Sequence, residues 1–161
     1  MGLSWNEIRD RAIKFSLEYK DEYYEKGETQ TFYNDFFNIF GVNRRRVATY
    51  EKPVKKLGKK RGYIDLFWKG MLLVEQKSEG KNLKKAKEQA LDYFPNLKDY
   101  ELPRYILVSD FQTFELYDLE TGEENKFTLQ ELYQNVGLFS FIAGYEKKCY
   151  KATKRKNPEK Q

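Results

Sequence analysis

The first third of the chain carries apolar side chains at helical spacing. Ser4, with Glu7 three residues later, matches a capping box, and the amphipathic run behind it predicts a helix to about residues 24–25. A phenylalanine at every fourth position predicts a second helix over residues 28–40, which ends at Gly41. We interpret this phenylalanine stripe as part of the core.

The rest of the chain predicts strands and two further helices. Alternating or continuous apolar runs predict strands over residues 45–54, 104–110 and 114–120 and a β-hairpin over residues 63–78. Apolar positions at helical spacing predict a helix over residues 82–94, which stops before Pro95, and a second capping box at Thr128 opens a short helix that reaches about Ile142. The order ααβββαββα favours an α/β fold with a central mixed β-sheet flanked by helices.

The hairpin places charged side chains in an otherwise apolar segment. Because side chains alternate along a strand, Glu75 and Lys77 share one face and Gln76 takes the other. One interpretation is a solvated strand face. The other is a Mg²⁺ site, because carboxylates are ligands that Mg²⁺ prefers. A bound Mg²⁺ can support phosphodiester hydrolysis by neutralising charge on the phosphate and activating a water. In that case Asp65, Glu75 and the backbone carbonyl of Gln76 bind the metal, and Lys77 positions the attacking water and stabilises the developing charge.

The turn of the hairpin decides whether Asp65 and Glu75 share a face. An odd number of loop residues puts them on the same side, whereas a two-residue turn separates them. We expect a three-residue loop over residues 68–70, with Gly70 in the left-handed conformation. Asp65 then lies across from Leu73 and diagonal to Glu75, about 7–8 Å away. The predicted core face of this hairpin consists of Ile64, Leu66, Trp68, Leu72 and Val74.

Composition narrows the chemistry and the class of protein. The chain has no histidine and one cysteine, which excludes histidine-dependent nucleophilic catalysis, an internal disulfide and a multi-cysteine zinc site. Its 161 residues, 40% of them hydrophobic, predict one globular domain. Since we find no apolar run of about 18 residues and no leader pattern, we expect no membrane span, no signal peptide and a cytoplasmic location.

The net charge of +5 hides a strong asymmetry along the chain. Residues 44–87 hold 15 basic and 4 acidic groups, whereas residues 88–146 hold 3 and 12. Such asymmetry is typical of a polyanion-binding face, although solvated lysine runs are also common. The predicted phosphate contacts are Arg44, Arg45, Arg46, Lys59, Lys60, Arg61 and Ser78. We expect residues 147–161 to form a flexible basic tail.

An aspartate on one strand, Glu-x-Lys on the next and a helix after them resemble the PD-(D/E)XK restriction-endonuclease core, with Ile64 at the proline position. Gln89 and Tyr93, one helical turn apart, match the Q-x-x-x-Y element of some branches of that superfamily. The resemblance implies that this pair lies beside the catalytic site and the DNA. The alternative is a tyrosine packed on the sheet and a solvated glutamine. Glu28 could supply a further metal-binding carboxylate, as an early-helix glutamate does in some relatives.

Longer strings make the resemblance more specific. Among them are QTFYNDFFNIFGVNRRRVATYE, KKRGYIDLFWKGMLLVEQKS and LPRYILVSDFQTFELYDL. Over about residues 3–146 they are similar to the N-terminal nuclease domain of MmeI-like type IIL restriction-modification enzymes. The resemblance implies a nuclease-like domain over residues 1–146. It also implies endonucleolytic cleavage of double-stranded DNA in host defence, with Mg²⁺ as cofactor and Mn²⁺ as a substitute.

In these relatives, methyltransferase and target-recognition domains follow the nuclease domain in one polypeptide, and dimerisation would permit double-strand cleavage. This chain has no glycine-rich methyl-donor motif, so we expect no S-adenosylmethionine site in it. The competing function is a catalytically silent DNA-binding or protein-docking module with the same fold. An RNA-directed nuclease is a third alternative.

Overall fold

Six strands and four α-helices form the described part of the chain. The computed structural model describes residues 2–21, 27–55, 61–78 and 82–144. The helices are α1 (Trp5–Glu18), α2 (Thr29–Ile39), α3 (Leu83–Leu91) and α4 (Ser140–Ala143). The strands are β1 (Thr49–Lys55), β2 (Arg61–Trp68), β3 (Leu72–Gln76), β4 (Tyr105–Ser109), β5 (Thr113–Asp118) and β6 (Glu124–Thr128). None of the helices in these ranges combines the length and the apolar character that a membrane crossing needs.

Short 3₁₀ turns connect these elements. They are η1 (Arg44–Arg46), η2 (Phe94–Asn96), η3 (Asp99–Glu101), η4 (Leu129–Gln134) and η5 (Val136–Phe139). The strands form one sheet in the order β1-β2-β3-β4-β5-β6, in which β3 and β4 run parallel and the other neighbours are antiparallel. The sheet is therefore mixed, as predicted.

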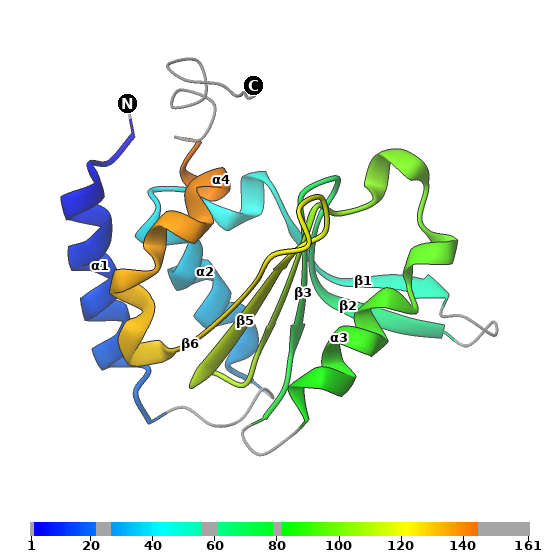
Figure 1. Ribbon diagram of the computed structural model, residues 1–161, viewed down its shortest axis with the longest axis horizontal. Helices are drawn as coiled ribbons and strands as arrows, with labels where there is room; N and C mark the ends of the chain where they lie inside the picture. The colour runs from blue at the N-terminus through cyan, green and yellow to red at the C-terminus, as the bar shows by residue number, and fades with distance from the viewer. Residues whose placement is uncertain (1, 22–26, 56–60, 79–81, 145–161) are drawn as a thin grey trace.

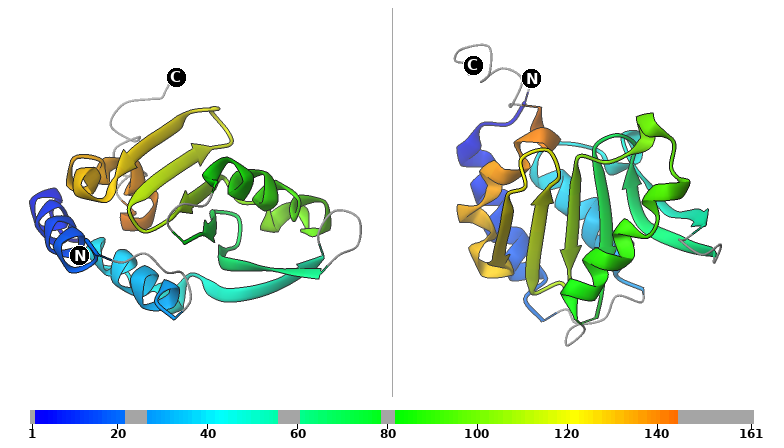
Figure 2. Two further views of the ribbon diagram at one scale, coloured as in Figure 1. Left: turned by 90° about the horizontal axis from the view of Figure 1, so that it is seen from below. Right: turned by 45° about the vertical axis from the view of Figure 1, so that its right-hand side comes forward.

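Helices cover both faces of this sheet. Helices α1 and α2 lie on one face with the C-terminal turns and α4, whereas α3 lies on the other (Figures 1 and 2). Every residue of β3 and of β4 is buried, because both central strands are covered from two sides. The site described below lies at the carboxyl end of β3.

The N-terminal predictions are confirmed. Ser4 and Glu7 form the capping box, in which each backbone N–H donates to the other side chain over 3.0 and 3.1 Å. The phenylalanine stripe of α2 is core: Phe32 contacts Phe15 and Phe111, with ring centroids 4.9 Å apart in each pair. These aromatic contacts fix α2 against α1 and against the end of β4.

Three predicted elements were wrong in extent. Helix α1 ends at Glu18, although residues 22–26 lie outside the described ranges. Residues 44–46 form η1 instead of the start of a strand, because the Asn43 side chain caps the turn by accepting from the Arg45 N–H over 3.0 Å. The predicted C-terminal helix is divided into η4, η5 and the four residues of α4.

Strand β6 was missed. Its burial pattern alternates, but Phe127 is its only buried residue, so the apolar signal is weak. The strand becomes visible only through its pairing with β5.

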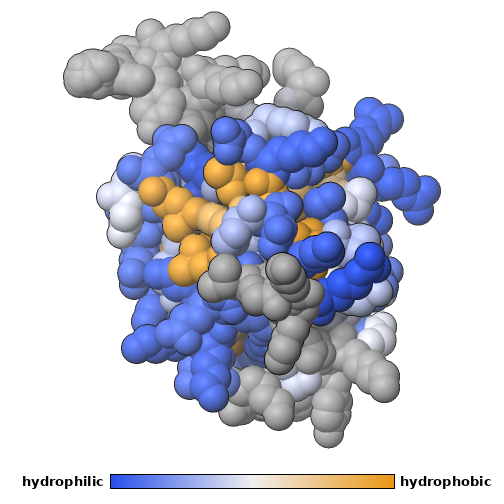
Figure 3. Space-filling view, turned by 90° about the vertical axis from the view of Figure 1, so that its right-hand side faces the viewer, coloured by the Kyte–Doolittle hydropathy of each residue, from blue (hydrophilic) through white to orange (hydrophobic). Residues whose placement is uncertain are grey.

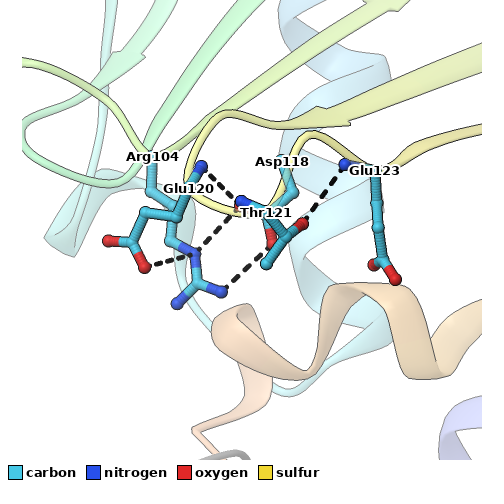
Figure 4. Close-up of polar contacts among 5 residues, drawn as sticks. All are labelled: Arg104, Asp118, Glu120, Thr121 and Glu123. Atoms are coloured by element: carbon cyan, nitrogen blue, oxygen red, sulfur yellow. Dashed lines mark hydrogen bonds and ion pairs between the residues drawn. The ribbon is translucent and has the colours of Figure 1, made fainter.

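A polar network ties the end of the sheet that lies opposite to the carboxyl end of β3 (Figure 4). Arg104, just before β4, contacts both carboxylate oxygens of Asp118 over 3.3 and 3.1 Å. Asp118 also accepts from the Glu120 N–H, and Thr121 Oγ1 accepts from the Glu123 N–H. These bonds close the β5–β6 turn against β4, so we assign them a structural role.

The side of the molecule that carries α3 and the turns after it shows an apolar patch among hydrophilic residues (Figure 3). Large exposed apolar side chains in this part of the chain include Leu91, Tyr100 and Leu102, which are 39%, 64% and 37% exposed. Apolar groups gathered on one face favour contact with another protein surface.

Candidate active site at the carboxyl end of strand β3

The hairpin turn has the odd length that a shared carboxylate site needs. Trp68 pairs with Leu72 and closes a three-residue loop in which Gly70 has φ +70°. The loop lies one residue later than predicted, because Trp68 remains in β2, where its ring packs near Phe37 and Phe141. The register Leu66 to Val74, continued by one residue, therefore puts Asp65 across from Glu75 instead of Leu73.

Strand β2 separates from β3 at Asp65. Leu66 and Val74 are the last residue pair, and beyond it the Gln76 N–H donates to Asp65 Oδ2 over 2.7 Å. The Asp65 carboxylate thus accepts from the Gln76 N–H in place of a backbone carbonyl of β2. The edge strand β1 is also irregular here, since Glu51, across from Asp65 in the β1–β2 register, has φ +53°.

This separation corrects the predicted core face. Leu66, Trp68, Leu72 and Val74 pack with α1 and α2, as expected. Ile64 packs instead with the α3 cluster, together with Phe67 and Leu73. The alternation of side chains along β2 therefore breaks between Ile64 and Leu66, and Asp65 sits at the break.

Two side chains of β3 reach the site from opposite faces of the strand. Glu75, a carboxylate only 2% exposed, faces the α3 side, and the fully buried Gln76 faces α2. The Gln76 side-chain oxygen accepts from the Tyr33 hydroxyl of α2. In an extended strand the N–H and C=O of one residue point to the same edge, so the Gln76 carbonyl is directed toward Asp65.

Lys77 is held in place by α3. Its Nζ donates to Gln89 Oε1 over 2.9 Å, and its backbone N–H donates to the Ser109 carbonyl of β4 over 2.8 Å. Gln89 is therefore not simply solvated. The sheet end and α3 together fix both ends of the lysine.

Tyr93 is a buried tyrosine within the electrostatic reach of both carboxylates. It follows the end of α3 at Leu91, is 1% exposed, and donates its hydroxyl to the Tyr63 carbonyl over 2.9 Å. Burial, together with the negative charges of Glu75 and Asp65, raises the pKa of Tyr93 above its usual range. Its phenol stays protonated at neutral pH. The structure thus brings together Asp65, Glu75, Lys77, Gln89 and Tyr93.

The ligands at this point suit a hard divalent cation. Two carboxylates and a backbone carbonyl offer only oxygen atoms, which Mg²⁺ prefers, and Mg²⁺ is often held by one or two carboxylates with waters and substrate phosphates. Within the described ranges no three acidic, histidine or cysteine side chains gather closely enough to hold a metal. Glu28 therefore does not join the pair. It precedes α2, where its charge adds to the effect of burial on the pKa of Tyr19.

The predicted phosphate contacts have different surroundings. Arg44 is fixed by hydrogen bonds and by Tyr50, whereas Arg45, Arg46 and Arg61 are exposed. Ser78 is partly buried directly after Lys77. Lys59 and Lys60 lie outside the described residues, as does the predicted tail over residues 147–161.

Sequence reasoning missed Tyr33. Burial, with the charge of Asp65 as the next cause, raises the pKa of Tyr33 well above the usual range, so Tyr33 is a neutral hydrogen-bond donor. A signal was present, because a tyrosine among buried phenylalanines needs a polar partner inside the core.

The chain is similar to a known protein family and to a solved structure. The sequence profile of the family described as "MmeI, N-terminal domain" matches residues 8–157. A chain of the solved structure "cryoEM structure DrdV-DNA complex" has the same fold, with a TM-score of 0.52 and 15% identity. The match covers 88% of this chain but 14% of that chain's length. Comparison with curated proteins gave no match.

The fold is therefore the expected restriction-enzyme-like α/β fold, with a six-stranded mixed sheet flanked by helices. At this level of identity the structural likeness shows the fold alone. The profile match extends over most of the chain, from α1 through the end of the sheet and beyond. The chain belongs to the MmeI N-terminal domain family.

Proposed function

We propose that this domain is a Mg²⁺-dependent endonuclease that hydrolyses phosphodiester bonds in double-stranded DNA, with Mn²⁺ able to replace Mg²⁺. The observation that carries the proposal is the buried Glu75 carboxylate across from Asp65 in the strand register. Lys77 follows Glu75 by two residues, and Gln89 holds its Nζ. Burial of an acidic group in a polar cluster is typical of functional sites. The restriction-enzyme fold, shared with a DrdV chain solved in complex with DNA, supports DNA as the substrate.

Each residue has a distinct role in this mechanism. Asp65 and Glu75 would hold the cation together with the Gln76 carbonyl. When bound, the cation would neutralise charge at the scissile phosphate and would lower the pKa of the attacking water. Lys77 Nζ orients the attacking water and stabilises the charge that develops on the phosphate. The attacking water gives up a proton to solvent as its oxygen bonds to phosphorus. The bond from phosphorus to the leaving sugar oxygen breaks, and that oxygen takes up a proton from solvent.

We propose that other domains provide the methylation and target recognition of a restriction-modification system. The chain corresponds to 14% of the length of the similar chain, so we assign methylation and target recognition to partner domains of the same polypeptide. Such an enzyme acts in the cytoplasm, and pairing of two nuclease domains would allow both DNA strands to be cut.

Plasmid cleavage tests the proposal. The purified chain is incubated with supercoiled plasmid in Mg²⁺, in Mn²⁺ and in EDTA, beside Lys77→Ala and the control Lys69→Ala. Lys69 is an exposed lysine in the loop of the same hairpin. We expect metal-dependent nicking or linearisation by the wild type and by Lys69→Ala, and a loss of at least about 100-fold in Lys77→Ala. Equal cutting by Lys77→Ala would refute the assigned site.

A docking role without cleavage is the second candidate. The apolar patch on the side of the molecule that carries α3 favours contact with another domain (Figure 3). A wild-type chain that is inactive with both metals, and that remains inactive when the partner domains are added, would support docking over catalysis.

A further inference from the structure

A row of amide side chains runs along α2, beside the phenylalanine stripe. Gln30, Asn34 and Asn38 are spaced four residues apart and all three are exposed, so they share one face of the helix. Tyr50 of β1 donates toward this row, to the Gln30 carbonyl over 2.6 Å and to Asn34 Oδ1 over 2.8 Å. The row is therefore attached to the edge strand next to the candidate active site.

Arg44 is held rigidly at the end of this row. Its Nε donates to Asn34 Oδ1 over 2.9 Å, its Nη1 donates to the Ala48 carbonyl over 2.8 Å, and its guanidinium lies 4.0 Å from the centroid of the Tyr50 ring. Within the part of the chain that the structure describes, no carboxylate lies within 4 Å of Arg44, Arg45 or Arg46. Arg44 thus keeps N–H donors and an uncompensated charge.

These groups line an open pocket of about 300 Å³, formed by Asn34, Asn38, Asn43, Arg44 and Arg45. The orientations of two amides are fixed. Asn34 Oδ1 accepts from Arg44 and Asn43 Oδ1 accepts from the Arg45 N–H, which leaves both Nδ2 groups as donors. No acidic side chain lines the pocket. Guanidinium and amide N–H groups without a competing carboxylate are the environment that binds an oxyanion.

The position of the pocket relates it to the candidate active site. Tyr50, under Arg44, directly precedes Glu51, which lies across from Asp65 in the β1–β2 register. Strands lie about 4.8 Å apart, so the pocket is on the order of 10 to 15 Å from Asp65. When one phosphate of a DNA strand lies in the candidate active site, another phosphate of the same strand, a few nucleotides away, can reach the pocket.

We infer that the pocket between α2 and η1 binds a backbone phosphate of the DNA strand that is cut. Its ligands are the side chains of Arg44, Arg45, Asn34 and Asn43. This inference rests on the proposed function for the identity of the strand. Such a contact is independent of base sequence and fixes the register of the strand relative to Asp65 and Glu75. A phosphate contact of this kind places the scissile bond whichever bases surround it.

The salt dependence of DNA binding tests the inference. Fluorescence anisotropy with a labelled 20-bp duplex in EDTA gives the slope of log Kobs against log salt for wild type, Arg45→Gln and Arg9→Gln. Both variants remove one exposed positive charge, but Arg9 is on α1 and bonds only to Asn6 among the described residues. We expect Arg45→Gln to make the slope shallower by about 0.9, with Arg9→Gln close to wild type. Equal slopes for the two variants would refute the site.

A second measurement identifies the ligand directly. The side-chain amide resonances of Asn34 and Asn43 are followed by NMR during titration with duplex DNA and, separately, with inorganic phosphate. Shifts with duplex at micromolar concentration support the inference. Shifts with inorganic phosphate alone would show a free-anion site, and no shift in either titration would show no site; both results overturn it.

Failure of the inference is distinguishable from failure of the proposed function. If plasmid cleavage is absent while Arg45→Gln lowers the salt slope, the pocket stands and catalysis does not. If the plasmid is cut but Arg45→Gln behaves as Arg9→Gln does, catalysis stands and the pocket does not.

Discussion

The carboxylate of Asp65 accepts a hydrogen bond from the backbone N–H of Gln76 over 2.7 Å. A proposed metal ligand therefore also holds the end of the neighbouring strand in place. Because Gln76 is fully buried, its N–H has no water as a substitute partner. Removal of Asp65 thus has a structural consequence besides the loss of a ligand.

Two substitutions at Asp65 separate these roles. Asp65→Asn keeps an acceptor oxygen but loses the charge, so we expect stability close to wild type and no Mg²⁺-dependent cleavage. Asp65→Ala leaves the buried N–H unsatisfied and should lower the free energy of unfolding by about 1–3 kcal/mol. Urea denaturation and plasmid cleavage measure the two effects. Equal stability of both variants would contradict the structural role.

Gln89 positions Lys77. Gln89→Ala removes the acceptor that lies 2.9 Å from Lys77 Nζ, so the lysine gains rotameric freedom. We expect the single-turnover cleavage rate to fall by about 10- to 100-fold, with DNA affinity and stability nearly unchanged. Glu88→Ala, an exposed neighbour on α3, is the control. A parallel fall in stability, or an unchanged rate, would argue against positioning.

Tyr33 donates a hydrogen bond to the buried side-chain oxygen of Gln76. In the described part of the chain, Gln76 Nε2 has no hydrogen-bond partner. The hydrogen bond from the Tyr33 hydroxyl to Gln76 Oε1 is therefore important for the stability of this buried side chain. Tyr33→Phe should therefore destabilise by about 1–3 kcal/mol, whereas Tyr100→Phe, at a position 64% exposed, should be neutral.

The double variant Tyr33→Phe/Gln76→Leu checks this assignment. It replaces both partners by apolar groups, so it should be less destabilised than the sum of the single variants. Additive effects in urea denaturation would show that the two side chains are not energetically coupled.

Gly70 sets the length of the hairpin turn. Its φ of +70° disfavours any side chain, and an added Cβ would lie 3.2 Å from the Tyr100 carbonyl oxygen. We expect Gly70→Ala to cost about 1–2 kcal/mol of unfolding free energy. Gly137→Ala is the matched control, because a Cβ there meets nothing within 4 Å and the backbone is not left-handed. Equal melting temperatures for the two variants would contradict this account of the turn.

Local pattern made parts of the site predictable. The alternation of β3 separates Glu75 from Gln76, and the odd turn closed around Gly70 puts Asp65 level with Glu75. Gln89 and Tyr93 lie one helical turn apart in sequence, which brings both toward the same strand end. The alternation, the odd loop length and the helical spacing depend on backbone periods within a few residues, so the sequence alone predicts them. The exact partner of Asp65 does not follow from them, because the loop begins one residue later than predicted.

Packing between distant segments decided the rest. Trp68 remained in β2 because of its aromatic neighbours, which shifted the loop by one residue. The Tyr33 to Gln76 bond joins residues 43 positions apart, and no periodic pattern encodes such a contact. The side chain of Arg44 has a fixed position in the pocket because Asn34 and Tyr50, from other elements, contact it.

The sequence by itself determined the family, the order of most elements and the chemical types at the candidate active site. Only the tertiary structure decided that Asp65 replaces a backbone acceptor, that Ile64 turns to the α3 cluster and that Glu28 stays apart from the two carboxylates. The physical reason is that strand separation and side-chain convergence depend on how helices pack on both faces of the sheet, which is a property of the whole core.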